Sequence, residues 1–96
     1  MKTIYISGAI TGLQPEEYLN RFADAANQFK AKGWQVINPC ELTHCENATW
    51  ADYMLTDIKA LFSCHAIYML DNWQQSKGAR IEHFIAKEMD KEVYYQ

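Results

Sequence analysis

The chain has 96 residues, of which 49% are hydrophobic and 22% are charged, and this composition predicts a single globular domain over residues 1–96. The net charge of −3 argues against a nucleic-acid polymer as partner, because a phosphate backbone binds basic surfaces. A small anion is compatible with this charge, since backbone amides can hold it. Three cysteines, no signal-like N-terminus and no apolar run of about 20 residues predict a cytoplasmic protein that does not bind a membrane.

The first part of the chain alternates strand, helix and strand. Residues 2–7 (KTIYIS) are β-branched and aromatic, which predicts a buried strand. A proline and two glutamates then indicate a helix start, and Gly33 ends that helix. Residues 34–38 (WQVIN) predict the second strand. Between the strands, the apolar positions recur at helical spacing: Tyr18, Phe22, Ala25 and Phe29.

The second part continues the alternation. A helix is predicted over residues 49–62, opening at a threonine N-cap, and a strand over residues 65–70. A loop at residues 71–77 precedes a helix over residues 78–89, and residues 91–95 predict a short last strand.

This order of elements predicts an α/β fold, specifically a flavodoxin/Rossmann-like three-layer domain with a four-stranded parallel sheet. Ligands bind such sheets at the carboxyl ends of the strands. We therefore expect the site where three loops meet, at residues 7–13, 39–48 and 71–77.

The start of the last predicted helix is suited to an anion. Ser76, Gly78 and Ala79 lie where the first backbone amides of a helix have no internal partner, so amides and a hydroxyl could hold a phosphate or carboxylate. The alternative is that Ser76 is only an N-cap and Gly78 only a turn residue.

Two acidic residues interrupt apolar helix faces. Asp57 falls on a stripe with Trp50, Met54 and Leu61, and Glu82 falls on one with Ala79, Ala86 and Met89. A carboxylate on a buried face is either paired or functional, and each could also be a boundary residue with its head in water. A carboxylate pair is typical of enzymes that cleave glycosidic bonds, one acting as nucleophile and the other as acid. Together with an anion site, this pair suggests a nucleotide.

Other residues allow other interpretations. Cys40, His44, Cys45 and Cys64 are of types that bind zinc, but no CxxC or HxxxH pair occurs, so we expect no metal. Most aromatic residues should lie in the core. Trp73 is predicted in a loop beside the site, where it could stack on a base or pack as a lid.

The segments YISGAITG, VINP and IYMLDNWQQSKGARIEHFIA resemble a group of small bacterial and phage domains over nearly the whole chain. Through a few motifs they also resemble the nucleoside 2-deoxyribosyltransferases and the 2'-deoxynucleoside 5'-monophosphate N-glycosidases. Those enzymes carry a Ser-or-Asp-x-Gly-x-x-x-Glu element that ends in the catalytic glutamate. Residues 76–82 have this spacing, and the serine form is the one in the monophosphate hydrolases, where it helps to hold the 5'-phosphate.

The resemblance implies Glu82 as nucleophile and Asp57 as the catalytic aspartate, which would assist protonation of the departing base or position Glu82. It implies Tyr5 and Gly8 as substrate-binding residues, to which we add Ser7 between them and Trp73. This chain departs from the resembling proteins in having His65 before the third strand, no arginine in the loop AITGLQ, and a shorter length.

We therefore expect a domain that binds a nucleotide and hydrolyses the N-glycosidic bond of a 2'-deoxynucleoside 5'-monophosphate. It would use no metal or organic cofactor and would assemble as a homodimer or larger homo-oligomer. The alternatives are a nucleoside 2-deoxyribosyltransferase and a non-catalytic module that binds or sequesters a nucleotide.

Overall fold

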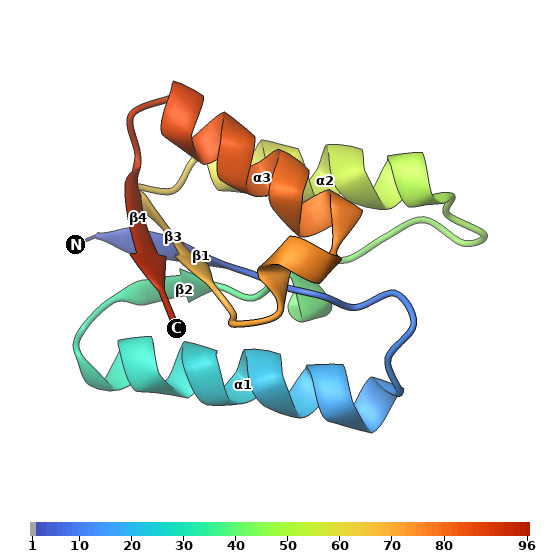
Figure 1. Ribbon diagram of the computed structural model, residues 1–96, viewed down its shortest axis with the longest axis horizontal. Coiled ribbons are helices and arrows are strands. Elements are labelled where there is room, and N and C mark those ends of the chain that lie inside the picture. The colour runs from blue at the N-terminus through green and yellow to red at the C-terminus, as the bar shows by residue number, and fades with distance from the viewer. Residues whose placement is uncertain (1) are drawn as a thin grey trace.

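The protein, described over residues 2–96 by a computed structural model, is built on four parallel strands (Figure 1). Their order in the sheet is β2-β1-β3-β4. The bounds are Thr3–Ser7 for β1, Gln35–Ile37 for β2, Ala66–Met69 for β3 and Glu92–Tyr95 for β4. The predicted α/β class and four-stranded parallel sheet are therefore confirmed.

The helices cover both faces of this sheet and complete three layers. Helix α1 (Pro15–Ala31) lies on one face, and α2 (Trp50–Phe62) and α3 (Lys77–Glu88) lie together on the other (Figure 1). Two short 3₁₀ helices, η1 (Pro39–Glu41) and η2 (Trp73–Gln75), occupy segments predicted as loops. No helix within residues 2–96 is long and apolar enough to cross a membrane.

The strands remain parallel, but the side of the sheet on which the chain adds strands reverses between β1 and β3. From β1 the chain passes to β2 on one side, then returns across β1 to β3 and onward to β4. Where successive connections leave in opposite directions, the loops at the carboxyl ends of the two strands separate and leave a crevice. The topology therefore places a crevice next to the carboxyl ends of β1 and β3.

Strand β1 contributes side chains to both sides of the sheet. Because successive residues of a strand point to opposite faces, Ile4 and Ile6 pack toward α1, whereas Tyr5 and Ser7 point toward α2 and α3. Among described residues, the first core contains Ile4, Ile6, Phe22, Ala25, Phe29, Ala66, Tyr68 and Leu70. The second contains Tyr5, Leu61, Cys64, Ile67, Met69, Ala79 and Ala86.

Two ends of the predicted helix stripes do not reach the core. Trp50 is 46% exposed, because it is the first residue of α2 and extends beyond the sheet. Met89 is 45% exposed, because α3 ends at Glu88 and the chain turns away there. The inner members of both stripes are buried as predicted, including Met54, Leu61, Ala79 and Ala86.

Candidate active site

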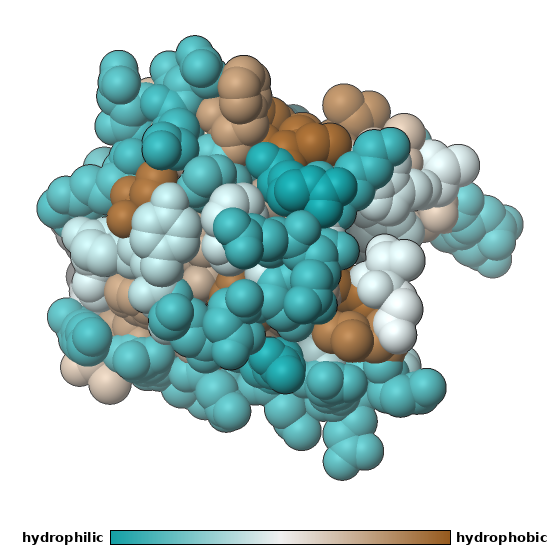
Figure 2. All heavy atoms as spheres, viewed as in Figure 1, coloured by the Kyte–Doolittle hydropathy of each residue, from teal (hydrophilic) through white to brown (hydrophobic). Residues whose placement is uncertain are grey.

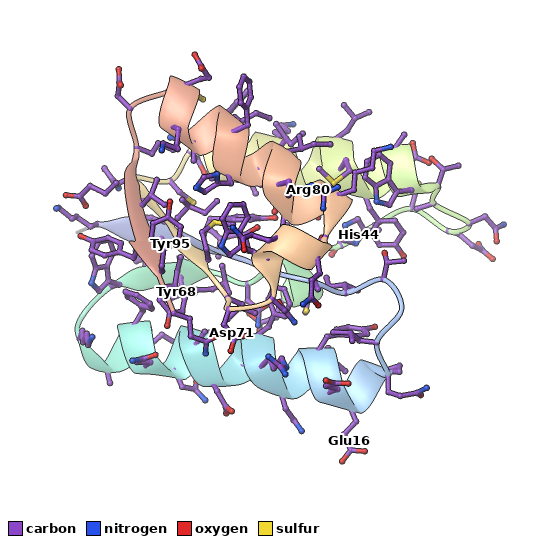
Figure 3. All side chains as sticks on the ribbon, in the orientation of Figure 1. Glu16, His44, Tyr68, Asp71, Arg80 and Tyr95 are labelled. Atoms are coloured by element: carbon purple, nitrogen blue, oxygen red, sulfur yellow. The ribbon has the colours of Figure 1, made fainter. Side chains whose placement is uncertain are left out.

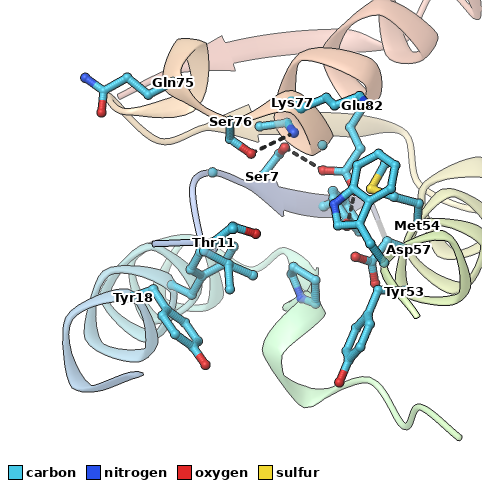
Figure 4. Close-up of a pocket in the computed structure, with 18 residues that line it drawn as sticks. Ser7, Thr11, Tyr18, Tyr53, Met54, Asp57, Gln75, Ser76, Lys77 and Glu82 are labelled. Carbon is cyan, nitrogen blue, oxygen red and sulfur yellow. Dashed lines mark hydrogen bonds between the residues drawn. The ribbon is translucent and has the colours of Figure 1, made fainter. Parts of the chain in front are cut away.

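A cavity of about 820 Å³ opens at the crevice between the two halves of the sheet (Figure 4). Figure 2 shows the surface hollowed on the side where the loop after β1 and the loop before α2 project. The lining comes from β1 and its following loop, from α1 and η1, from α2, and from the start of α3. It includes Tyr5, Ser7, Gly8, Thr11, Trp50, Tyr53, Asp57, Ser76, Lys77, Gly78, Ala79 and Glu82.

Glu82 lies at the inner wall of this cavity and is only 5% exposed. Its two carboxylate oxygens accept hydrogen bonds from two hydroxyls of β1. Tyr5 Oη donates to Oε2 at 2.8 Å, and Ser7 Oγ donates to Oε1 at 2.7 Å. Tyr5 and Ser7 reach the same carboxylate because they are two residues apart on one strand face. The carboxylate is thereby held in one orientation toward the cavity.

Burial is the largest influence on the ionisation of this carboxylate, because a charged group loses hydration inside the protein. It raises the pKa of Glu82 from 4.5 to about 7. The hydrogen bonds from Ser7 and Tyr5 oppose the rise, and the nearby charge of Asp57 adds to it. For Tyr5, burial and the charges of Glu82 and Asp57 raise the pKa well above 10, so the phenol stays protonated and remains a donor.

Asp57 reaches the same cavity from α2, so the two predicted acids converge on one site. Its side chain is 14% exposed, and Oδ1 lies 3.5 Å from Nε2 of His44. Burial raises the pKa of Asp57, and the neighbouring His44 acts in the opposite direction. His44 belongs to the loop that leads into α2, at the end of the molecule where α2 and α3 begin (Figure 3).

At the start of α3, Ser76 acts as the N-cap, and its hydroxyl oxygen accepts a 3.1 Å hydrogen bond from the amide of Ala79. The prediction that the Ala79 amide is free for an anion is therefore wrong, because this amide is already bonded. The amides of Lys77 and Gly78 are in the first turn, where a helix offers no internal acceptor. The ammonium of Lys77 lies 5.0 Å from the ring centre of Trp50 across the cavity mouth.

Two of the predicted site residues are glycines in close contact with neighbours. A Cβ on Gly8 would lie 2.6 Å from Cδ1 of Leu70, so β1 and the end of β3 can approach only because this side chain is absent. A Cβ on Gly78 would lie 3.0 Å from the sulfur of Met54, where α3 meets α2. Both glycines border the cavity, and packing alone accounts for Gly8.

Trp73 lies outside the cavity lining. Its ring stacks on His83 with ring centres 4.2 Å apart, and it packs against the second core. The aromatic rings that border the cavity include Trp50 and Tyr53, whereas the sequence led us to expect most aromatic residues in the core. Their position in the first turn of α2, ahead of the buried part of the stripe, is the signal that could have indicated their role.

Metal-binding residue types do not gather in the described part of the chain. Within residues 2–96, no group of three or more His, Cys, Asp or Glu side chains is placed to hold a metal ion. Cys40, Cys45 and Cys64 are free thiols. Burial raises the pKa of Cys40 to about 11, which disfavours the thiolate that a nucleophile or zinc ligand requires.

The solved structures that are similar to this fold include an N-glycosidase and a deoxyribosyltransferase. The CMP N-glycosidase BcmB of Clostridium botulinum is 20% identical, with a TM-score of 0.69 over 98% of this chain and 67% of its own. A 2-deoxyribosyltransferase from Leishmania mexicana is also 20% identical, with a TM-score of 0.73 over 99% of this chain and 63% of its own. This chain thus spans about two thirds of either protein, and at such identity the likeness shows the fold.

No curated protein matches the chain. A family described as a domain of unknown function, DUF4406, matches residues 2–95, and the chain belongs to this family.

Proposed function

We propose that this domain cleaves the N-glycosidic bond of a 2'-deoxynucleoside 5'-monophosphate, with Glu82 as the nucleophile. The observation that carries the proposal is the buried carboxylate of Glu82, held by the hydroxyls of Tyr5 and Ser7 on the wall of a cavity that Asp57 shares. A fixed carboxylate nucleophile and a second carboxyl group are the two parts that a retaining glycosidase requires.

The first chemical step breaks the bond between the sugar and the base. An oxygen of Glu82 attacks the anomeric carbon, and the electrons of the C–N bond leave with the base. Asp57 gives its proton to the departing base and becomes a carboxylate. In the second step Asp57 takes a proton from water, which attacks the anomeric carbon, and the bond to Glu82 breaks.

Before substrate binds, a pKa of about 7 means that part of the population carries a proton on Glu82. Substrate changes this distribution. The positive charge that develops at the anomeric carbon stabilises the Glu82 carboxylate, and a base over Asp57 excludes water and favours its protonated form. Tyr5 orients the nucleophile throughout.

The phosphate would bind at the start of α3. The Ser76 hydroxyl proton and the amides of Lys77 and Gly78 provide donors there, and Lys77 adds a positive charge. Trp50 and Tyr53 supply flat surfaces at the cavity for a base. The names of the two similar structures, one an N-glycosidase of CMP and the other a 2-deoxyribosyltransferase, support chemistry at the bond between sugar and base.

The test is chromatography of free base after incubation with a panel of deoxy- and ribonucleosides and their 5'-monophosphates. We expect release from a deoxynucleoside monophosphate, and loss of at least about 10³-fold in Glu82→Gln, which removes the nucleophile with little change in shape. Glu88→Gln, an exposed substitution on the same helix, should leave the rate unchanged.

Two outcomes would replace the proposal. Transfer of deoxyribose to an added second base, with preference for unphosphorylated nucleosides, would identify a transferase. Calorimetric binding of a nucleotide without release of base, equal in the parent and in Glu82→Gln, would identify a non-catalytic binding module.

A further inference from the structure

Behind the cavity wall, His44 and Asp57 form an isolated polar pair. Nε2 of His44 and Oδ1 of Asp57 are both fully buried, and neither has a hydrogen-bond partner within the described residues. They lie 3.5 Å apart, slightly beyond a good hydrogen bond. Burying two polar atoms without partners is unfavourable, so such a pair in a native protein requires an explanation.

The surroundings of His44 hold its ring against α2. The imidazole stacks on the ring of Tyr53, with ring centres 4.1 Å apart and planes inclined by 36°. Tyr53 precedes Asp57 by one helical turn, so both groups that contact His44 come from the same face of α2. This stacking leaves Nε2 directed toward Oδ1 of Asp57. The fully buried Oδ1 faces the histidine, and Oδ2 is left for the cavity that Asp57 lines.

We propose that His44 is a positioning residue that donates a hydrogen bond from Nε2 to Oδ1 of Asp57 and so directs the proton of the catalytic acid to Oδ2. This inference rests on the proposed function. If Oδ1 accepts from His44, an acid proton is excluded from Oδ1 and resides on the oxygen that faces the leaving base. After the proton is given up, the same bond stabilises the Asp57 carboxylate.

The other titratable groups near Asp57 cannot act as the hydrogen-bond donor to Oδ1. The titratable groups near it are Tyr5 from β1, Cys40 from η1 and Glu82 from α3, in addition to His44 from the loop before α2. Tyr5 is bonded to Glu82, and the thiol of Cys40 is a weak donor. Of these neighbours, it is His44 that opposes the rise of the Asp57 pKa.

His44→Phe keeps a ring against Tyr53 and removes the donor, whereas His44→Gln places an amide near the position of Nε2. We expect His44→Phe to lower kcat for base release about tenfold to a hundredfold, with KM nearly unchanged, and His44→Gln to retain most of the rate. His83→Phe is the matched control, because His83 also stacks on an aromatic ring, Trp73, but outside the cavity lining.

A substrate whose base leaves without a proton separates this role from a general structural one. In an N7-alkylated purine nucleotide the base already carries a positive charge, so its release needs no acid. We expect His44→Phe to release this base at the parental rate. An equal loss on both substrates, or no loss on either, would overturn the proposal.

The hydrogen bond itself is measured without turnover. The ¹⁵N resonance of His44 Nε2 should move when Asp57 is changed to Asn, and the ¹³C carboxyl titration of Asp57 should move to higher pH in His44→Phe. If the parent releases no base from any nucleotide, the proposed function fails. These two spectra then still test whether His44 and Asp57 form the hydrogen bond. If the His44 resonance is unchanged in the Asp57 variant and the Asp57 titration is unchanged in His44→Phe, no such bond exists.

Discussion

The hydroxyl of Tyr5 donates a 2.8 Å hydrogen bond to Oε2 of Glu82, which joins the first strand to the last helix across 77 positions of sequence. Together with the bond from Ser7, it holds a carboxylate whose burial raises its pKa to about 7. The site therefore keeps an acidic group whose pKa is close to neutral pH. The contacts of Glu82 lead to predictions about its ionisation, the reaction rate and the stability of the protein.

Removing the phenol should shift the ionisation of Glu82. The bond from Tyr5 lowers the pKa of Glu82, so in Tyr5→Phe the midpoint of the Glu82 ¹³C carboxyl titration should move above about 7. If the proposed reaction holds, kcat should also fall about tenfold to a hundredfold, because the nucleophile loses part of its orientation. Tyr94→Phe removes an exposed phenol and should change neither value. A Glu82 midpoint that moves downward in Tyr5→Phe would contradict this account.

Glu82 should make the protein less stable at neutral and alkaline pH than at acidic pH. Between the usual pKa of 4.5 and about 7, the folded protein keeps a proton that the unfolded chain has lost, so the free energy of unfolding decreases as pH rises. The full decrease is about 3 kcal/mol. Glu82→Gln lacks this term and should exceed the parent in stability by roughly that amount at pH 8, measured by urea denaturation.

The advantage of Glu82→Gln should shrink as pH falls and reach zero below 4.5, where Glu82 itself is protonated in both states. Glu88→Gln, an exposed change on the same helix, should follow the parent at every pH. A Glu82→Gln curve parallel to that of the parent would mean that the carboxylate is not buried as described.

Gly8 should tolerate no side chain. In Gly8→Ala the new Cβ meets Cδ1 of Leu70 at 2.6 Å, and we expect a loss of about 1–3 kcal/mol in the free energy of unfolding. In Gly78→Ala the nearest atom is the flexible sulfur of Met54 at 3.0 Å, and alanine favours a helix, so the loss should be smaller.

A double-mutant cycle tests the cause. Leu70→Ala alone should cost about 2–5 kcal/mol. Gly8→Ala combined with it should cost less than the sum, because the contacts with Cδ1 at 2.6 Å and Cγ at 3.0 Å are removed and only the contact with Cβ at 2.8 Å remains. Strict additivity of the two changes would show that the Cγ and Cδ1 atoms of Leu70 are not what excludes a side chain at Gly8.

Ser76 can be tested separately as a helix cap and as a phosphate ligand. Ser76→Ala should lose about 1 kcal/mol of stability, because the Ala79 amide loses its acceptor. Ser76→Asp restores a capping oxygen and should recover that stability, measured by thermal unfolding. Its negative charge at the proposed phosphate site should raise KM for a monophosphate and leave the corresponding nucleoside almost unaffected.

Thr49→Asp is the matched control for Ser76→Asp. It changes the N-cap of α2, which is exposed and not part of the cavity lining, and should alter neither KM nor stability by much. Equal effects of Ser76→Asp on nucleotide and nucleoside would place the phosphate elsewhere.

Patterns with a short period predicted the elements well. The stripe of Phe22, Ala25 and Phe29 and the β-branched run of β1 depend on repeats of 3.6 and 2 residues, which the local backbone sets. The spacing from Ser76 to Glu82 is likewise local, and the structure brings both residues to one cavity on successive turns of α3.

What the chain by itself determined is the order and type of its elements and the alternation that puts Tyr5 and Ser7 on one face of β1. Only the tertiary structure decided that this face meets Glu82, that Trp50 borders the cavity in place of Trp73, and that His44 lies behind Asp57. These relationships join residues from different elements, and they exist only after the sheet order and the crossing of the helices have brought separate segments together. No local repeat encodes that closure, because it follows from how whole faces pack.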